Sequence, residues 1–285
     1  MSIKRIIIKA LDRPGGRGLL ALGASAYAKK LTENNVKIFF DETWLHYIDG
    51  FYFPDGQKFR YYEDTVLNWK AYLGKCFKNT EDHWFYTYKP KKGDIIVDIG
   101  AGVGEDLFVL TDAVGDSGCI IAVEAHPTTF LDMKKLCQWN RYANVKLFQN
   151  AITDKPSTLY IDDVDEHETN SVLMQGNDNK RFPVAGVTLD SICSNENISH
   201  IDFLKMNIEG AEKYAIHGME KVIKNTKHVC ISCHDFRADR GDGEEFRSRE
   251  IILEFLRDNG FEIFWRNDDP RDYVRDQLNG VNKKL

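Results

Sequence analysis

Short apolar runs alternate with segments of helical hydrophobic spacing along residues 93–285. The runs predict strands over Asp94–Ile99, Cys119–Glu124, Val145–Gln149, Phe203–Asn207, His228–His234 and Phe261–Trp265. The segments between them predict helices over Glu105–Ala113, Thr128–Tyr142, Ala211–Lys224 and Glu244–Asn259. This alternation is typical of an α/β fold with a parallel sheet. Gln277–Asn282 has the pattern of one last strand, and Ser157–Ile161 and Phe182–Val187 predict an extended pair that flanks a polar loop over Asp162–Asn179.

Residues 1–92 have a different texture. A Pro-Gly-Gly break at 14–16 precedes a predicted helix over Leu19–Leu31, and residues 36–92 are dense in aromatic side chains. Pro54–Gly56 is a turn signal between two β-rich runs and predicts a hairpin. We therefore expect an N-terminal extension over 1–92, made of a helix and a β-hairpin on the substrate side, and a second domain over 93–285.

Charge is unevenly distributed along the chain, whose net charge is −6. Residues 1–30 contain seven Lys or Arg residues and one acid, Asp12, so this segment carries +6 and the other 255 residues carry −12. An acidic body lacks the basic groove that nucleic acids require, so we expect no nucleic-acid partner. The basic segment has two open interpretations: peripheral contact with an anionic membrane, aided by Ile6–Ile8 and Leu19–Leu20, or a solvated helix face.

The six cysteines are scattered along the chain. This spacing favours reduced, buried thiols over a disulfide framework and indicates a cytoplasmic protein. No apolar run reaches the roughly 18 residues of a membrane span, and no signal-peptide core is visible.

A glycine-rich loop follows the first strand of the second domain. Gly100, Gly102 and Gly104 alternate directly after Ile95–Ile99 and before a helical segment, and such a turn brings backbone N–H groups close to a ligand. By itself the loop fits a dinucleotide or S-adenosylmethionine, although its third glycine comes one residue earlier than in the dinucleotide fingerprint. Asp98 would attract the amino group of S-adenosylmethionine and repel a pyrophosphate, so the loop favours S-adenosylmethionine.

Polar residues follow several other strands, at the edge of the sheet where open α/β proteins bind ligands. Glu124 has two acceptor oxygens that match the two hydroxyls of a ribose, in S-adenosylmethionine or in NAD. Asn150 is placed to meet adenine. The other strand ends supply the acids Glu209 and Glu212, and the pair His234 and Asp235. We expect functional roles for these residues except Glu212, which we interpret as a helix-start acid favoured by the helix dipole.

At these residues the chain resembles the FkbM-type branch of class I S-adenosylmethionine-dependent methyltransferases. The resemblance covers Gly93 to the C-terminus and is carried by Val97–Gly104, Glu124–Pro127, Val187–Asp190 and Asp202–Glu212. It implies a Rossmann-like seven-stranded sheet with helices on both faces and an antiparallel last strand. It also implies methyl transfer to a hydroxyl oxygen of a sugar or natural product, including glycans and glycolipids. The residues that would hold the cofactor are Asp98, Gly100, Ala101, Gly102, Glu124, Ala125, Asn150, Ala151 and Asn207. Asn207 replaces the family's usual aspartate and cannot serve as a base.

His234 is the predicted general base, because the ordinary pKa of histidine lies near neutral pH. Asp235 would orient its ring, or bind a divalent cation such as Mg²⁺ together with Glu209. Phe236–Arg249 is rich in arginine and glycine and is either a mobile lid or an ordinary charged loop.

Two other functions stay open. An NAD-dependent or nucleotide-sugar oxidoreductase would use a similar sheet, although the chain lacks the usual Tyr-x-x-x-Lys pair after the fourth strand. The second alternative is a non-catalytic homologue that only binds the cofactor. Asn207 suggests this alternative, because it stands where the family usually has an aspartate.

Overall fold

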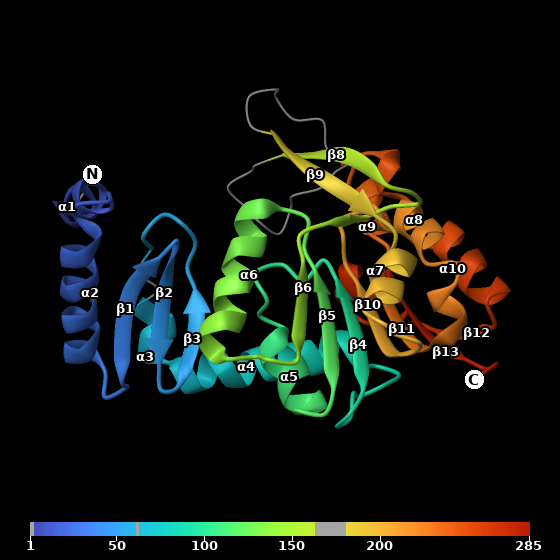
Figure 1. Cartoon of the computed structure of the whole chain (residues 1–285), viewed down its shortest axis with the longest axis horizontal. Coiled ribbons are helices and arrows are strands. Elements are labelled where there is room, and N and C mark those ends of the chain that lie inside the picture. The colour runs from blue at the N-terminus through green and yellow to red at the C-terminus, as the bar shows by residue number, and fades with distance from the viewer. Residues whose placement is uncertain (1–2, 61–62, 163–180) are drawn as a thin grey trace.

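The computed structural model describes residues 3–60, 63–162 and 181–285. Of the polar loop expected over Asp162–Asn179, only Asp162 is among them. A seven-stranded sheet forms the centre of the molecule, in the order β12-β13-β11-β10-β4-β5-β6 (Figure 1). Its strands are β4 (Ile95–Ile99), β5 (Cys119–Val123), β6 (Val145–Phe148), β10 (Ile201–Met206), β11 (Thr226–Ser232), β12 (Phe261–Phe264) and β13 (Gln277–Asn282). Only β13 runs antiparallel to its neighbours. The predicted α/β class, the seven strands and the antiparallel last strand are confirmed.

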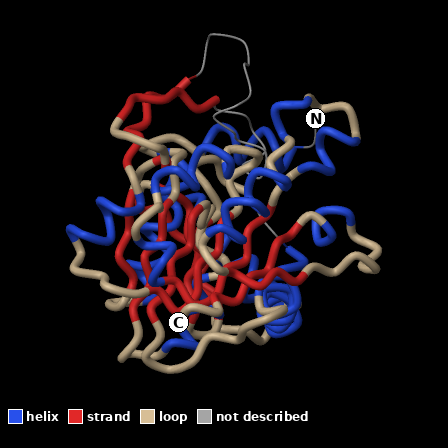
Figure 2. Tube along the Cα trace, turned by 90° about the vertical axis from the view of Figure 1, so that its right-hand side faces the viewer, coloured by secondary structure: helices blue, strands red, loops and turns tan. Residues whose placement is uncertain are grey.

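The sheet has an apolar core on each face because side chains alternate along a strand. Ile96 of β4 joins one core and the next residue, Val97, joins the other. Helices cover both faces, with the strands grouped between them (Figure 2). The helices of this part are α5 (Leu107–Val114), α6 (Pro127–Asn140), α7 (Leu189–Asn195), α8 (Glu212–Ala215), α9 (Asp235–Asp239), α10 (Arg249–Asp258) and α11 (Asp272–Arg275).

Two expected helices are shorter than predicted. The region Ala211–Lys224 forms α8 followed by two 3₁₀ turns, Ile216–Gly218 and Val222–Asn225. A Cβ at Gly218 would lie 2.1 Å from the carbonyl oxygen of Thr153, so this segment packs too closely on its neighbour for an ordinary helix face. The helix expected from Glu244 begins at Arg249, and Glu244–Phe246 is a 3₁₀ turn.

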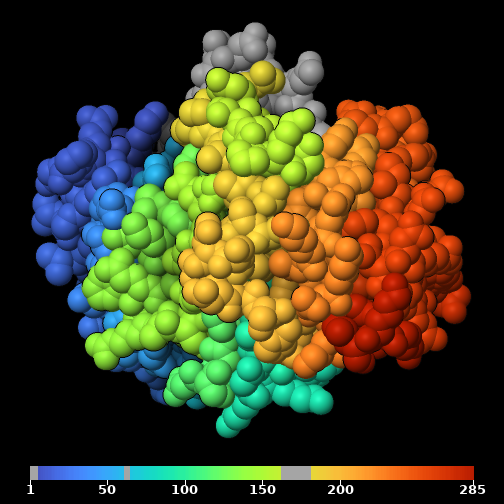
Figure 3. Space-filling view, turned by 45° about the vertical axis from the view of Figure 1, so that its right-hand side comes forward, coloured from blue at the N-terminus to red at the C-terminus, as the bar shows by residue number. Residues whose placement is uncertain are grey.

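The N-terminal residues form a second, smaller layer. It comprises α1 (Ile3–Leu11), α2 (Arg17–Leu31), β1 (Val36–Asp41), β2 (Thr43–Ile48), β3 (Phe51–Pro54), α3 (Glu63–Leu67) and α4 (Trp69–Trp84). β1, β2 and β3 form an antiparallel sheet. The buried residues of this N-terminal layer, among them Trp44 of β2 and Trp69 of α4, belong to the same apolar core as Leu107 and Leu136 on one face of the central sheet. In the space-filling view these residues make up one flank of the molecule, opposite the C-terminal residues (Figure 3).

The prediction of a hairpin turn at Pro54–Gly56 is wrong. The chain turns instead at Asp49 and Gly50, whose φ angles are 48° and 102°. After Pro54 the chain continues along β2, because the N–H of Asp55 donates to Trp44 and the N–H of Trp44 donates to Gly56. The extension therefore contains three strands and four helices among the described residues, where the sequence predicted one helix and one hairpin.

The extended pair is confirmed. β8 (Ser157–Asp162) and β9 (Arg181–Val187) are antiparallel, and the short β7 (Ala151–Ile152) joins them in a third sheet of order β7-β9-β8. This small sheet lies above the carboxyl ends of β4, β5 and β6 (Figure 1).

Candidate functional site

A cleft of about 1460 Å³ opens at the carboxyl ends of the central strands. It is lined by residues that directly follow four of them, including Gly100 after β4, Glu124 after β5, Asn207 after β10 and His234 after β11. β4 lies between β5 and β10, so the chain leaves the sheet in opposite directions on its two sides. In open α/β sheets, ligands bind at such a point.

The glycine loop forms the floor of this cleft. Gly100 has a φ angle of +79°, and a Cβ there would lie 2.0 Å from the carbonyl oxygen of Asn207. No other residue can occupy this position without moving β4 away from β10. Gly102 and Gly104 also have positive φ angles, which explains why glycines alternate here.

The backbone N–H groups of the loop are largely committed inside the protein. Those of Gly100 and Ala101 donate to Val123, that of Gly104 donates to Ala101, and that of Gly102 donates to the Glu124 carboxylate at 3.0 Å. The expectation that these groups would contact a ligand is therefore wrong for these four positions. A pyrophosphate needs free N–H donors and is repelled by a carboxylate, so this loop does not suit a dinucleotide.

Glu124 is fixed in one orientation. Its Oε2 accepts from Gly102, and its Oε1 accepts from the N–H of His126 at 2.8 Å. Burial raises the pKa of this carboxyl, and the two N–H donors oppose that rise. Each oxygen keeps a second lone pair, so the carboxylate can still accept from two neighbouring hydroxyls.

The remaining expected cofactor residues also line the cleft, namely Ala101, Ala125, Asn150, Ala151 and Asn207. The Asn150 amide donates to the carbonyl of Ala185 at 3.1 Å, which ties it to β9. The N–H of Asn207 donates to Ile99 across the β4–β10 junction.

Asp98 is not on the cleft surface. Its side chain is fully buried, and its Oδ1 lies 2.8 Å from the Nζ of Lys205. Lys205 also contacts Asp106 at 3.1 Å. Burial raises the pKa of the Asp98 carboxyl. At Asp106 burial acts in the same direction, but the Lys205 ammonium and the hydrogen bond from Thr80 together outweigh it and lower the pKa. The direct contact expected between Asp98 and a cofactor amino group finds no support in this geometry.

Lys205 is a site residue that our sequence interpretation missed. It lines the cleft, and its ammonium lies 4.7 Å from the ring centroid of Trp84. A lysine between apolar neighbours, Leu204 and Met206, was the signal for it, because a buried cation requires a carboxylate partner.

The structure brings Glu209, Glu212 and His234 together at one end of the cleft. His234 Nε2 lies 3.3 Å from Glu209, and His234 Nδ1 lies 3.0 Å from Glu212. Glu209 also accepts from Arg237 at 2.9 Å. Both Glu209 and His234 have positive φ angles, 55° and 60°, at the turns that leave β10 and β11.

This arrangement contradicts the predicted role of His234 as a general base. Burial alone would lower its pKa, but the two facing carboxylates outweigh burial and raise the pKa to about 10. The ring is therefore an imidazolium at neutral pH and has no lone pair to accept a proton. Glu212, which we interpreted as a helix-start acid, is fully buried and holds both this ring and the N–H of Ile208, which donates to Oε1 at 2.8 Å.

Asp235 is a capping residue, which contradicts its expected catalytic and metal-binding roles. Its Oδ1 accepts from the N–H groups of Ser248 and Arg249, at 2.8 and 3.0 Å, where α10 begins. Among residues 3–60, 63–162 and 181–285, no group of three or more His, Cys, Asp or Glu side chains could hold a metal ion. The expected site for Mg²⁺ at Glu209 and Asp235 is thus not supported.

The N-terminal layer, which we expected on the substrate side, contributes a wall of the cleft. Trp84 and Tyr72 of α4 line it, as do Asp55 and Arg60 after β3. The His83 ring stacks on the Trp84 ring with 4.2 Å between the ring centroids, and its centroid lies 5.4 Å from that of the Tyr273 ring in α11. The aromatic density of residues 36–92 was the only sequence signal for this wall.

The described part of the chain contains no helix long and apolar enough to cross a membrane. All six cysteines are free thiols.

Comparison with known proteins gave a family match. The model described as the methyltransferase FkbM domain matches residues 98–263. A search of curated proteins found no match.

Several solved structures align with parts of this chain at low similarity. The methyltransferase FkbM of Methylobacillus flagellatus KT aligns with a TM-score of 0.49 and 14% identity, over 76% of this chain and 61% of that one. The present chain thus spans less than two thirds of that protein. Fibrillarin from Methanococcus jannaschii, a pre-rRNA processing protein, aligns with a TM-score of 0.43 and 14% identity, over 88% and 98% of the two chains. Fibrillarin from Aeropyrum pernix, in complex with natively bound S-adenosyl-L-methionine, aligns with a TM-score of 0.41 and 14% identity, over 75% of this chain and 76% of that one.

The matched segment contains the glycine loop and the strand-end residues from Asp98 to His234. Because residues 98–263 make up more than half of the 285 residues, the chain belongs to the FkbM methyltransferase domain family.

Proposed function

We propose that this protein transfers a methyl group from S-adenosylmethionine to a hydroxyl oxygen of a sugar-containing acceptor. The observation that carries the proposal is that one continuous cleft is lined by both sets of residues. The glycine loop and Glu124 line it, and so do Glu209 and the aromatic residues Phe236 and Tyr273. Membership of a methyltransferase family supports it.

The cofactor half of the cleft fits S-adenosylmethionine better than NAD. The N–H groups of the glycine loop are committed inside the protein and do not favour a pyrophosphate. Glu124 would accept from the ribose hydroxyls, and Asn150 with Ala151 would lie along the adenine. When bound there, S-adenosylmethionine supplies an electrophilic methyl group.

The other half of the cleft suits a sugar. Tyr273 and Phe236 line it, and flat aromatic faces stack well on sugar rings. The cleft volume of about 1460 Å³ exceeds the 300–1,000 Å³ of ordinary small-molecule pockets, which leaves room for an acceptor beside a cofactor.

Glu209 takes the role that we had expected of His234. Its carboxylate lines the cleft and can accept the hydrogen bond, and then the proton, of an acceptor hydroxyl. His234 and Arg237 hold the two oxygens of Glu209 in place, at 3.3 and 2.9 Å. His234 is thus a positioning residue, because it acts through Glu209.

Two measurements test the proposal. Calorimetric titration should show binding of S-adenosylhomocysteine and no binding of NAD; the opposite result would support the oxidoreductase. Transfer of a labelled methyl group to a panel of glycans should fall at least about 100-fold in Glu209→Gln, with unchanged binding of S-adenosylhomocysteine. Glu196→Gln, on a surface ion pair with Lys146, is the matched control. Cofactor binding without transfer to any glycan would contradict the proposed activity and favour the non-catalytic homologue.

A further inference from the structure

Four of the five most exposed large aliphatic side chains of the described residues lie on the two N-terminal helices. Leu22 and Leu19 of α2 are 71% and 67% exposed, and Ile6 and Ile7 of α1 are each 51% exposed. Soluble proteins seldom group such side chains without a partner. Both helices lie at one end of the molecule, away from the central sheet (Figure 1).

These side chains are not needed to hold the helices on the protein. α2 packs on the body with Leu20, Ala24 and Ala28, and α1 does so with Ile8 and Leu11. At about 100° per residue, Leu19 and Leu22 fall on the opposite side of α2 from the buried residues. Lys29 and Lys30 fall within the same outward arc of about 100°.

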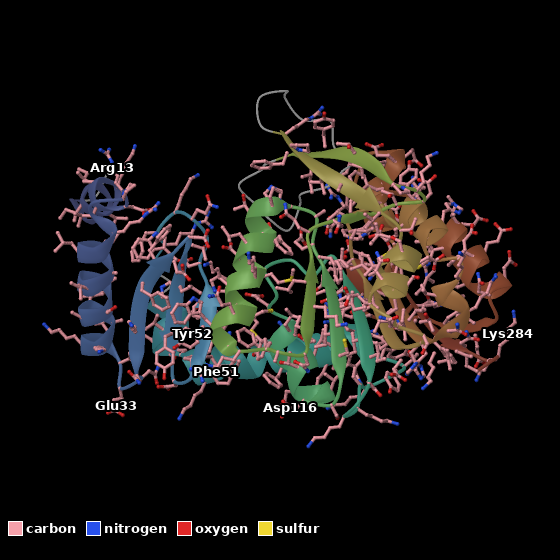
Figure 4. The ribbon with its side chains drawn as sticks, in the orientation of Figure 1. Arg13, Glu33, Phe51, Tyr52, Asp116 and Lys284 are labelled. Atoms are coloured by element: carbon pink, nitrogen blue, oxygen red, sulfur yellow. The ribbon has the colours of Figure 1, made fainter. Side chains whose placement is uncertain are left out.

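Four described cations of this region have no carboxylate partner among the described residues. Lys9, Arg13, Lys29 and Lys30 are exposed, and none of them contacts an acid in the described part of the chain. Arg13 lies at the end of α2 that is nearest to α1, whereas the acid Glu33 lies at the other end (Figure 4).

Asp12, the single acid of residues 1–30, is turned toward the body. Its Oδ1 accepts from Arg17 and from the Trp44 indole at 3.1 and 3.0 Å, and its Oδ2 accepts from the N–H of Phe59 at 2.7 Å. Its charge is neutralised by Arg17 inside the fold. The outward surface of the two helices is therefore cationic, although the protein as a whole carries −6.

We infer that Ile6, Ile7, Lys9, Arg13, Leu19, Leu22, Lys29 and Lys30 form a docking face for an anionic lipid bilayer. Aliphatic side chains beside unpaired cations are complementary to a surface with acyl chains below negative headgroups. A soluble acidic protein would match the cations but would leave Leu19 and Leu22 in water at its rim. A second copy would place cations against cations, because the face carries no acid of its own.

The docking face is connected to the cleft. Asp12 binds the backbone at Phe59, and the next residue, Arg60, lines the cleft. Docking would therefore hold the N-terminal wall of the cleft near the bilayer surface.

Sedimentation of the full chain with unilamellar vesicles tests this inference. We expect binding to vesicles of phosphatidylcholine with 30% phosphatidylglycerol that is at least about tenfold tighter than to phosphatidylcholine alone. Because each basic residue near such a surface strengthens binding about fivefold, Lys29→Glu with Lys30→Glu should weaken it at least about 30-fold. High salt should release the protein.

Matched controls separate the face from overall charge and from folding. Lys75→Glu with Lys78→Glu makes the same charge change on exposed positions of α4, and it should leave vesicle binding within about threefold. Leu19→Ser with Leu22→Ser should weaken binding, whereas Ile251→Ser, at an exposed position of α10, should not. Binding of S-adenosylhomocysteine should be the same in all variants, which keeps this test independent of the proposed activity.

Three results would overturn the inference. One is no binding to anionic vesicles, or equal binding to both kinds. Another is equal loss in the α4 control. The last is self-association of the protein, detected by ultracentrifugation and abolished by Leu19→Ser with Leu22→Ser, without any vesicle binding; that result would assign the face to a second copy.

Discussion

The charge state of His234 predicts how the stability of this protein depends on pH. The ring is buried between Glu209 and Glu212, with contacts of 3.3 and 3.0 Å, and its pKa is raised from 6.5 to about 10. His234→Gln removes the titrating group and keeps a side chain of similar size that can still donate a hydrogen bond.

The sign and size of the effect follow from proton linkage. Because the pKa is higher in the folded state, the folded protein binds the proton more tightly than the unfolded chain. The stabilisation is complete below pH 6.5 and is lost as pH rises to about 10. Between these values the wild type loses about 1.4 kcal/mol per pH unit relative to His234→Gln. From pH 7 to pH 9 the difference between the two proteins should therefore shrink by roughly 2–3 kcal/mol.

Urea unfolding of both proteins at pH 7, 8 and 9 measures this difference. Titrating groups that do not contact His234 are common to both proteins and cancel in the comparison, so the measured change belongs to His234 together with Glu209 and Glu212. A difference that stays constant across this range would refute the reasoning, because it would mean that His234 carries no proton that the unfolded chain lacks. It would also restore His234 as a candidate base.

Three further predictions concern the rest of the site. Gly100→Ala should reduce S-adenosylhomocysteine binding more than tenfold in calorimetry, because its Cβ would meet the Asn207 carbonyl at 2.0 Å; Gly23→Ala, which has open space, should not. Lys205→Met should lower the free energy of unfolding by about 3–5 kcal/mol in urea titrations, since Asp98 and Asp106 would lose their buried cation. A loss below about 1 kcal/mol would contradict this. Asp235→Ala should lower the free energy of unfolding by about 1–2 kcal/mol in the same assay, because α10 loses its cap. Dialysis of the wild type against EDTA should leave methyl transfer unchanged. A metal requirement would show that Asp235 was assigned wrongly.

Some boundaries of the fold could be predicted from local pattern, and others could not. The helix over Thr128–Tyr142 is α6, nearly residue for residue, because its apolar spacing and its Pro127 start signal agree. The helix expected over Ala211–Lys224 breaks because Gly218 packs on Thr153, more than 60 residues earlier, and such a contact leaves no local signal. The turn at Asp49 and Gly50 was overlooked in favour of the stronger turn signal at Pro54–Gly56.

The sequence by itself determined the class of sheet and the glycine turn that follows β4. Strand alternation assigns Ile96 and Val97 to opposite cores, and the alternating glycines predict a tight turn, which the positive φ angles of Gly100, Gly102 and Gly104 confirm. These features depend on residues close together in the chain, so periodicity and glycine spacing reveal them.

Only the tertiary structure decided what each polar strand-end residue does. Asp98, His234 and Asp235 are all polar residues at strand ends. One is neutralised by Lys205, one becomes an imidazolium between two carboxylates, and one caps α10. The physical reason is that the charge and the free lone pairs of a buried group depend on its nearest partners, and folding takes these partners from distant parts of the chain.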